Sequence, residues 1–266
     1  MRHIVIFGAA SGFGKRLSEE LTMLGHQVYG IDRSAEGLQR LPTPIHTFVA
    51  DVTKDKEIQA AIDGVMTITD RIDVVVNNVG YGMYGPVERS FDEIHHQFDV
   101  NVFGYTRVNN AVLPILRQQR SGTIIFTASV VSHISTTGLG WYAASKHAIK
   151  AMAEALRMEV MDFGIHVVQI EPGAVKTNFH ATANTTYPTS KIGDYDDVLT
   201  HFETFQNKMY ANAPSDHSTI KAMVHACTSN KPKWVYRTTM QAKVFAWMRP
   251  RLPLKWYTAL VRMVEK

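Results

Sequence analysis

Tyr142 and Lys146 lie four positions apart in the segment Tyr-Ala-Ala-Ser-Lys, and Ser129 lies thirteen residues before Tyr142. If the chain is helical from Gly140 onward, the phenol and the ammonium share one helix face. A phenol has an ordinary pKa near 10, so it needs a pKa lowered by roughly 3 units, about 4 kcal/mol, to act as a base near neutral pH. One positive charge about 4 Å away, at an effective dielectric near 20, supplies roughly that amount. The spacing predicts a proton-transfer site; the alternative is an ordinary amphipathic helix that carries the same pattern.

A glycine-rich segment near the N-terminus predicts a nucleotide-binding turn. Residues 2–7 have the composition of a buried strand, and Gly8, Gly12 and Gly14 follow before a helical pattern begins. Such a turn lets backbone N–H groups approach a pyrophosphate at the positive end of a helix. The next predicted strand ends at Asp32, eighteen residues after Gly14, close to the spacing of an acid that binds the adenosine ribose. This unit predicts dinucleotide binding.

Strand and helix patterns alternate along the chain. The predicted strands are Arg2–Gly8, Gln27–Asp32, Ile45–Ala50, Ile72–Asn77, Gly122–Ala128, Ile165–Glu171 and one near Lys233–Tyr236. The predicted helices include Lys15–Leu24, Lys54–Thr69, Phe91–Gln119, Gly140–Phe163 and Ser215–Ser229. This alternation predicts an α/β class fold, a doubly wound parallel sheet (Rossmann fold) of about seven strands with helices on both faces. Ligands bind at the carboxyl ends of such strands, where Asp32, Asp51, Asn78 and Ser129 fall.

From residue 2 to about residue 177 the chain resembles single-domain members of the short-chain dehydrogenase/reductase family. Two positions depart from the family pattern: Phe7 replaces the usual threonine and Val79 the usual alanine, and neither change removes a group that does chemistry. The resemblance rests on ordered motifs, which are Gly8-x-x-x-Gly12-x-Gly14, Asp51-Val52-Thr53, Asn77-Asn78-Val79-Gly80, Asn101, Ser129, Tyr142-x-x-x-Lys146, and Pro172-Gly173 followed by Thr177.

The resemblance implies catalytic roles for Asn101, Ser129, Tyr142 and Lys146. Tyr142 would exchange a proton with the substrate oxygen, and Ser129 would hydrogen-bond the same oxygen. Lys146 would lower the pKa of Tyr142 and hold the nicotinamide ribose. Asn101 would hold a water that connects Lys146 to solvent, with a structural hydrogen bond to a helix carbonyl as the alternative. The implied cofactor-binding residues are Gly8, Ser11, Gly12, Phe13, Gly14, Asp32, Arg33, Asp51, Val52, Asn78, Gly80, Tyr142, Lys146, Pro172, Gly173, Val175 and Thr177.

Asp32 and Arg33 favour opposite cofactors. Asp32 would accept hydrogen bonds from the adenosine ribose hydroxyls and repel a 2′-phosphate that carries roughly −1.5 to −2 charges. Arg33 could attract that phosphate, or lie over the adenine face. We expect NAD, because the acid ends a rigid strand, and keep NADP as the alternative because of Arg33.

The expected activity is hydride transfer between NAD(H) and a secondary alcohol or ketone. The segment Tyr81–Glu88 resembles the steroid- and retinol-oxidising branch of the family, which favours a bulky, mainly apolar substrate. We expect residues 178–213, a polar segment of weak periodicity, to close the substrate pocket. The alternatives are a redox sensor that binds the dinucleotide without useful turnover, and an epimerase or dehydratase on the same scaffold. The predicted substrate residues are Tyr81, Met83, His133 and Leu139, which otherwise only pack the sheet edge.

The composition agrees with a single domain over residues 1–266, since 45% of the residues are hydrophobic, 20% are charged, and no linker divides the chain. A core strand opens the chain, no apolar window of about 18 residues is present, and Cys227 is the single cysteine. We therefore expect a cytoplasmic protein. The resemblance implies a homodimer or homotetramer through the helix after Lys146, where Met152, Met158 and Met161 serve packing or subunit contacts. We expect no metal, because His95 and His96 are adjacent and no metal-binding motif accompanies the twelve histidines.

The last segment, residues 238–266, is a basic amphipathic extension. From residue 231 onward the chain carries nine Lys or Arg residues and one acid, Glu265. Lys255, Thr258, Arg262 and Glu265 form a narrow polar stripe on an otherwise apolar helix. We expect this helix to pack on its own domain or on a neighbouring subunit. A peripheral membrane contact is the alternative, and nucleic acid is not expected because no binding motif accompanies the charge.

Overall fold

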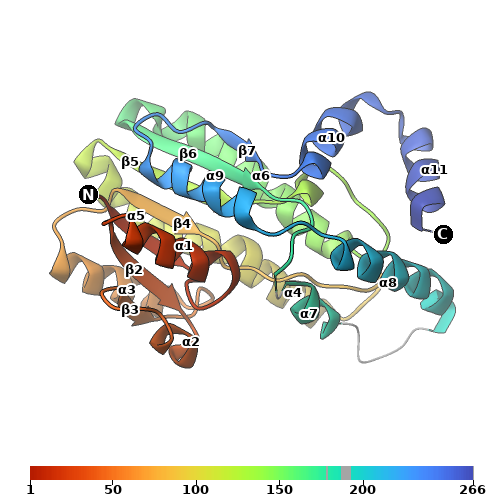
Figure 1. Cartoon of the computed structure of the whole chain (residues 1–266), viewed down its shortest axis with the longest axis horizontal. Coiled ribbons are helices and arrows are strands. Elements are labelled where there is room, and N and C mark those ends of the chain that lie inside the picture. Colours follow the sequence, from red (N-terminus) through yellow and green to blue (C-terminus); the bar gives the residue numbers. More distant parts are fainter. Residues whose placement is uncertain (178, 187–192, 266) are drawn as a thin grey trace.

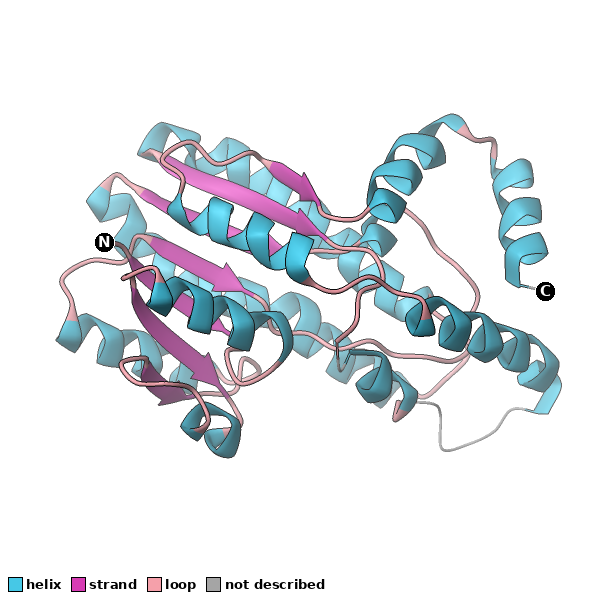
Figure 2. Ribbon diagram, in the orientation of Figure 1, coloured by secondary structure: helices cyan, strands magenta, loops and turns pink. Residues whose placement is uncertain are grey.

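Seven parallel strands form one sheet in the computed structural model, which describes residues 1–177, 179–186 and 193–265 (Figures 1 and 2). The strands are β1 (His3–Phe7), β2 (Gln27–Asp32), β3 (His46–Val49), β4 (Val74–Asn77), β5 (Gly122–Thr127), β6 (Ile165–Glu171) and β7 (Val235–Arg237). Their order is β3-β2-β1-β4-β5-β6-β7. The order reverses between β1 and β4, and a doubly wound sheet opens its ligand cleft at such a switch point. The predicted fold class is confirmed, and the strand bounds agree with the predicted ones within two residues.

Helices cover both faces of this sheet and bury its apolar strands. One core lies between the sheet and α3, α5 and α6, and the other lies between the sheet and α1, α2 and α9. The helices are α1 (Gly12–Met23), α2 (Ala35–Gln39), α3 (Asp55–Ile68), α4 (Phe91–Phe98), α5 (Gly104–Gln119), α6 (Gly140–Val160), α7 (Phe179–Asn184), α8 (Asp196–Ala211), α9 (His217–Thr228), α10 (Met240–Met248) and α11 (Leu254–Glu265). Three-residue 3-10 turns occupy Val130–Ser132, Met161–Phe163, Gly193–Tyr195 and Arg249–Arg251.

The predicted helix Phe91–Gln119 consists of three pieces. A π-helical turn, Asp99–Phe103, separates α4 from α5. Asn101 lies in this turn and its side chain is completely buried. Turns of this kind are rare inside helices and frequent at functional sites. The sequence pattern did not indicate it, because both flanking helices continue the same amphipathic periodicity.

A third apolar cluster lies beyond the carboxyl ends of the strands, where α7, α8, α10 and α11 gather (Figure 2). The expectation of weak periodicity over 178–213 is wrong for α8, which is a helix of 16 residues. Phe202, Gln206 and Tyr210 follow one another at four-residue intervals on this helix, and the first two are buried. This spacing was the available signal. Asn178 and residues 187–192 lie outside the described part of the chain.

The C-terminal helices pack on their own domain. This is one of the two arrangements that we expected for the basic C-terminal segment, the other being packing on a neighbouring subunit. Tyr257 is 5% exposed, its hydroxyl donates to the Ser135 carbonyl, and it accepts from the Ser135 N–H at 3.1 Å. Val261 also packs against the third cluster. Among the described residues, no helix is long and apolar enough to cross a bilayer.

Candidate active site

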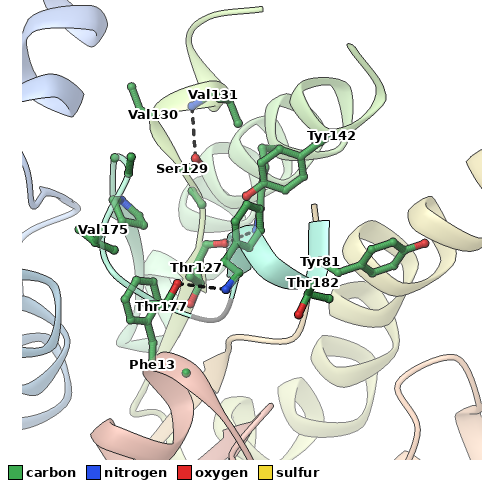
Figure 3. A pocket seen from close by; sticks show the side chains of 18 of the residues that line it. Phe13, Tyr81, Thr127, Ser129, Val130, Val131, Tyr142, Val175, Thr177 and Thr182 are labelled. Carbon is green, nitrogen blue, oxygen red and sulfur yellow. Dashed lines mark hydrogen bonds between the residues drawn. The ribbon is translucent and has the colours of Figure 1, made fainter. Parts of the chain in front are cut away.

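A cavity of about 920 Å³ opens at the carboxyl ends of the central strands. One end is formed by the glycine-rich turn after β1 and by the residues that follow β2 and β3. The other end is enclosed by the segment after β5 and by α7, α8, α10 and α11. The cavity therefore joins a polar groove to an apolar compartment, and the predicted proton-transfer residues lie where the two meet (Figure 3).

The glycine-rich turn fits a dinucleotide phosphate. Gly12 has φ +52°, and a Cβ there would meet nothing within 4 Å, so the backbone is open to the cavity. A Cβ on Gly14 would lie 1.9 Å from the Gly8 carbonyl oxygen, so only glycine allows α1 to approach the turn this closely. Asn78 holds the other side of the turn, since its Nδ2 donates to the Gly8 carbonyl at 3.3 Å. The backbone N–H groups at the start of α1 are thus placed for an anion.

Asp32 ends β2 at the rim of the groove. Its carboxylate accepts from the Ala10 N–H at 3.1 Å and from the Ser34 N–H at 3.0 Å, which fixes its orientation toward the turn. Arg33 also lines the groove and is exposed. Burial alone would raise the pKa of Asp51, but hydrogen bonds from Thr53 and the charges of Arg33 and Lys54 lower it overall. The carboxylates of Asp32 and Asp51 and the exposed guanidinium of Arg33 therefore share this end of the groove.

Ser129 and Tyr142 meet at the bottom of the cavity. Ser129 follows β5 and caps the 3-10 turn Val130–Ser132, where its Oγ accepts from the Val131 N–H at 3.3 Å (Figure 3). Tyr142 is 7% exposed and belongs to the first turn of α6. Burial raises the pKa of Tyr142 strongly, the nearby Tyr210 raises it further, and a hydrogen bond with Ser129 lowers it. At neutral pH this phenol carries its proton.

Lys146 lies one turn further along α6 and is 5% exposed. Its Nζ donates to the Thr127 carbonyl at 2.7 Å and lies 5.8 Å from the ring centre of Tyr142. Burial lowers the pKa of Lys146 to about 7. The expected lowering of the Tyr142 pKa by this ammonium is not found in this arrangement. The physical reason is that burial disfavours the charged forms of both side chains, and it outweighs their mutual attraction.

Asn101 clamps the segment after β4. Its Oδ1 accepts from the Tyr81 N–H at 3.0 Å, and its Nδ2 donates to the Tyr81 carbonyl at 2.9 Å and to Ser145 Oγ at 3.2 Å. The alternative that we kept, a bond to a helix carbonyl, is wrong, because the partners are a loop residue and a serine of α6. Asn101 does not line the cavity. Gly80 does line the cavity, and Asn101 fixes Gly80 beside Lys146.

Most of the predicted site residues line this one cavity. Two predicted substrate residues do not, so their assignment to the pocket is corrected: Met83 is buried under the loop, and Nε2 of His133 lies 3.0 Å from the buried carboxylate of Glu171. Gly14 lies beneath the turn instead of on the cavity surface. The predicted residues that line the cavity are Gly8, Ser11, Gly12, Phe13, Asp32, Arg33, Asp51, Val52, Asn78, Gly80, Tyr81, Ser129, Leu139, Tyr142, Lys146, Pro172, Gly173, Val175 and Thr177.

Tyr210 and its neighbours are site residues that the sequence analysis missed. Tyr210 lines the cavity from α8, and its ring stacks on His180 with the centres 4.4 Å apart. Tyr84 contacts both of them, through a hydrogen bond to Tyr210 and through its hydroxyl 3.1 Å from His180 Nδ1. Phe179 lies against Tyr142 with the ring centres 5.3 Å apart. Only the spacing of apolar side chains along α8 could have indicated this wall.

No cluster of three or more metal-ligating side chains occurs in the part of the chain that the structure describes. The proton-transfer end of the site presents the hydroxyls of Ser129 and Tyr142 and the amine of Lys146. Proton transfer at a substrate oxygen, next to a groove for a dinucleotide, is the chemistry that this arrangement can perform.

Comparison with known proteins agrees with this geometry. The short chain dehydrogenase family profile matches residues 2–188. The Helicobacter pylori protein VdlC, named as a short-chain type dehydrogenase/reductase, is 31% identical over 262 residues, which cover 98% of this chain and 96% of that protein. The 3-ketodihydrosphingosine reductase of Bacteroides thetaiotaomicron is 35% identical over 196 residues, 73% of this chain and 71% of that protein. A short-chain dehydrogenase structure from Streptomyces avermitilis superimposes with a TM-score of 0.83 at 27% identity, covering 98% of each chain.

The chain belongs to the short-chain dehydrogenase family. It is an NAD(P)-dependent oxidoreductase of that family. The resemblance drawn from the ordered motifs is thereby confirmed.

The lowered pKa of Lys146 predicts a pH-dependent stability. Between about pH 7, the folded value, and pH 10.5, the ordinary value, the unfolded chain holds a proton that the folded protein has released. The free energy of unfolding therefore gains a contribution that rises with pH in this window, by at most about 1.4 kcal/mol per pH unit. Below pH 7 the contribution is constant. Urea unfolding at several pH values should show this slope without added cofactor, and Lys146→Met should lack it.

The control for that experiment is Lys221→Met, which removes an exposed lysine on α9. The difference in unfolding free energy between the protein and Lys146→Met should change with pH. A pH-independent difference would contradict the burial of the ammonium.

Asn101→Ala should lower both the stability and the turnover. The change leaves the Tyr81 N–H without a side-chain partner, at a cost of about 1–3 kcal/mol, and leaves the Tyr81 carbonyl with only the long bond from Gln97 Nε2 at 3.4 Å. The freed loop also moves Gly80 away from Lys146. Thermal melting and kcat should therefore fall together.

Asn109→Ala is the matched control, because Asn109 is a buried asparagine that accepts from Asn77 Nδ2 at 3.1 Å and does not line the cavity. It should lower the melting temperature and keep kcat. Equal kcat in the two variants would reduce Asn101 to a purely structural role.

Proposed function

We propose that this chain catalyses the NAD(H)-dependent interconversion of a secondary alcohol and a ketone, with a bulky, mainly apolar substrate. One observation carries the proposal. The Ser129 and Tyr142 side chains both line a cavity that joins the dinucleotide groove to an apolar compartment. The site thus offers two donors to one substrate oxygen at the place where cofactor and substrate would meet.

The protonated state of Tyr142 supports reduction of a ketone at neutral pH. A phenol with a raised pKa holds its proton until a stronger base develops beside it, and an alkoxide is such a base. Tyr142 would give its proton to that oxygen, while Ser129 donates a hydrogen bond and stabilises the charge that develops there. The dinucleotide, when bound, supplies or accepts the hydride. Lys146 would hold the ribose hydroxyls and replenish the proton of Tyr142 from its own ammonium.

The lining of the compartment supports an apolar substrate. Side chains from four helices, α7, α8, α10 and α11, meet there, and few of them carry a polar group. The 3-ketodihydrosphingosine reductase among the relatives is named for a lipid ketone, which is a substrate of this class. The apolar side chains concerned are Val130, Val131, Ile134, Leu139, Phe179, Phe205, Met209, Val244, Phe245, Met248, Leu260 and Val261.

The acid at the end of β2 supports NAD over NADP. Asp32 is oriented by two backbone N–H groups toward the groove, and Asp51 adds a second negative charge nearby. A 2′-phosphate would meet both. The second arginine of this rim, Arg40, is already paired with Glu36.

We also propose that α6 carries a subunit contact. Met158 and Met161 are 69% and 59% exposed at its end, whereas Met152 packs into the core. Exposed methionines suit an adaptable apolar contact with a second copy of the chain.

Tyr142→Phe should keep dinucleotide affinity and lose turnover by at least about a thousandfold, because it removes the proton donor without changing the ring. Tyr29→Phe is the control, since Tyr29 is a buried tyrosine outside the cavity that bonds His3. The assay follows NADH consumption over a panel of ketones and alcohols. Undiminished turnover in Tyr142→Phe would refute the assignment. Steady consumption of NADH over the panel would also exclude a redox sensor and an epimerase. A higher kcat/KM for small polyols than for apolar alcohols would refute the proposed substrate class.

Asp32→Asn should shift the cofactor preference toward NADP. The substitution keeps the size of the side chain and removes the charge that repels a 2′-phosphate. The ratio of kcat/KM for NADP to that for NAD should rise roughly tenfold or more, since one removed charge of this kind is worth on the order of 1–2 kcal/mol. Asp63→Asn, an exposed acid on α3, is the control. An unchanged ratio would show that Asp32 does not face the ribose.

A further inference from the structure

The two C-terminal helices present a second apolar face, directed away from the protein. Helices α10 and α11 project from the body of the molecule at the carboxyl end of the sheet (Figure 1). Five large apolar side chains on this segment remain exposed by 64–72%, although the same helices also line the cavity. We call four of these residues, Met240, Trp247, Trp256 and Met263, the outer face; Leu254, two residues before Trp256, lies on another side of α11.

Helix α11 shows how the two faces are divided. Tyr257, Leu260 and Val261 turn toward the cavity, which accounts for one apolar stripe. Trp256 and Met263 are seven residues apart and are each 68% exposed, so they form a second stripe on another side of the helix. A helix that only packed on its own domain would need one apolar stripe. Within the described part of the chain, no other element covers this second stripe.

Basic side chains border this outer face. Lys255 and Arg262 are exposed and seven residues apart on α11, and Lys243 and Arg251 are exposed on the preceding segment. None of these four forms an ion pair among the described residues. The guanidinium of Arg251 instead lies 4.9 Å from the ring centre of Trp247. The segment after residue 230 contains nine basic residues and one acid.

We propose that the outer face docks the protein on an anionic lipid bilayer. Tryptophan and methionine enter the interface between headgroups and acyl chains, while the bordering lysines and arginines bind lipid phosphates. Charge decides between this partner and a second copy of the chain. A twofold contact would place the basic segment of one copy against that of the other, and their repulsion opposes it.

Docking by this face turns the cavity toward the bilayer. Val244 and Phe245 on α10, and Leu260 and Val264 on α11, line the cavity from the inner side of the same two helices. An apolar ketone dissolved in the membrane would then pass between the helices to Tyr142. This delivery route rests on the proposed function, whereas the docking rests on the surface alone.

The test measures vesicle binding without substrate or turnover, so its result is independent of the proposed function. The full-length protein is sedimented with vesicles of phosphatidylcholine alone and of phosphatidylcholine with phosphatidylglycerol, at low and at raised salt. We expect binding to the anionic vesicles only, and weaker binding at raised salt.

Two variants separate the contributions to docking. Lys255→Gln with Arg262→Gln should lower the partition coefficient roughly 25-fold, since each basic residue near an anionic surface contributes about fivefold. Trp256→Gln with Met263→Gln should lower the partition coefficient and reduce the quenching of tryptophan fluorescence by brominated lipid, with Trp247 left as the remaining outer-face tryptophan. None of these four residues lines the cavity, so turnover of a soluble substrate should be unchanged.

The matched controls are Lys56→Gln with Lys221→Gln, and Met23→Gln with Leu24→Gln, which change exposed residues elsewhere. They should bind like the unaltered protein. Equal sedimentation with neutral and anionic vesicles, or equal binding by all variants, would overturn the proposal. A dimer that Trp256→Gln with Met263→Gln converts to a monomer in light scattering would overturn it as well, because the outer face would then be a contact between copies.

Discussion

The hydrogen bond from Lys146 to the Thr127 carbonyl fixes the active site. A buried ammonium needs a partner, because an unpaired charge in an apolar interior costs several kcal/mol. The last carbonyl of β5 provides that partner at 2.7 Å, and it thereby sets the position of α6 over the sheet. Tyr142, one turn earlier on α6, is then placed beside Ser129, which follows β5 directly. The geometry of the proton-transfer pair follows from this one contact.

The same burial explains the electrostatics of the site. Withdrawal from water disfavours the phenolate of Tyr142 and the ammonium of Lys146 together. The phenol thus remains protonated while the amine titrates near neutrality. This combination suits a site that gives a proton to a substrate oxygen and recovers it from a neighbouring group. A bound dinucleotide would add its own charges to this balance.

The helices beyond the sheet form the part of the cavity that differs in character from the dinucleotide groove. The glycine-rich turn and the strand ends form a groove that any dinucleotide enzyme of this fold could use. The apolar compartment, in contrast, is built by α7, α8, α10 and α11 together with the segment after Ser129. Tyr257 on α11 ties that segment to the tail through Ser135. The apolar compartment and the outer face are thus two sides of the same pair of helices, α10 and α11.

Local patterns in the sequence determined the strands, the parallel sheet and the residues of the cofactor groove. Local patterns were sufficient because these features depend on hydrophobic periodicity, on glycine at a turn, or on polar residues at strand ends. All three are properties of short segments. Tertiary structure alone decided the π turn that buries Asn101, the pairing of His133 with Glu171, and the wall formed by Tyr210. It also decided the direction of the pKa of Tyr142, because that direction depends on how completely distant segments exclude water from the phenol. Contacts between residues a hundred positions apart leave no periodic signal in the sequence, so only the folded chain shows them.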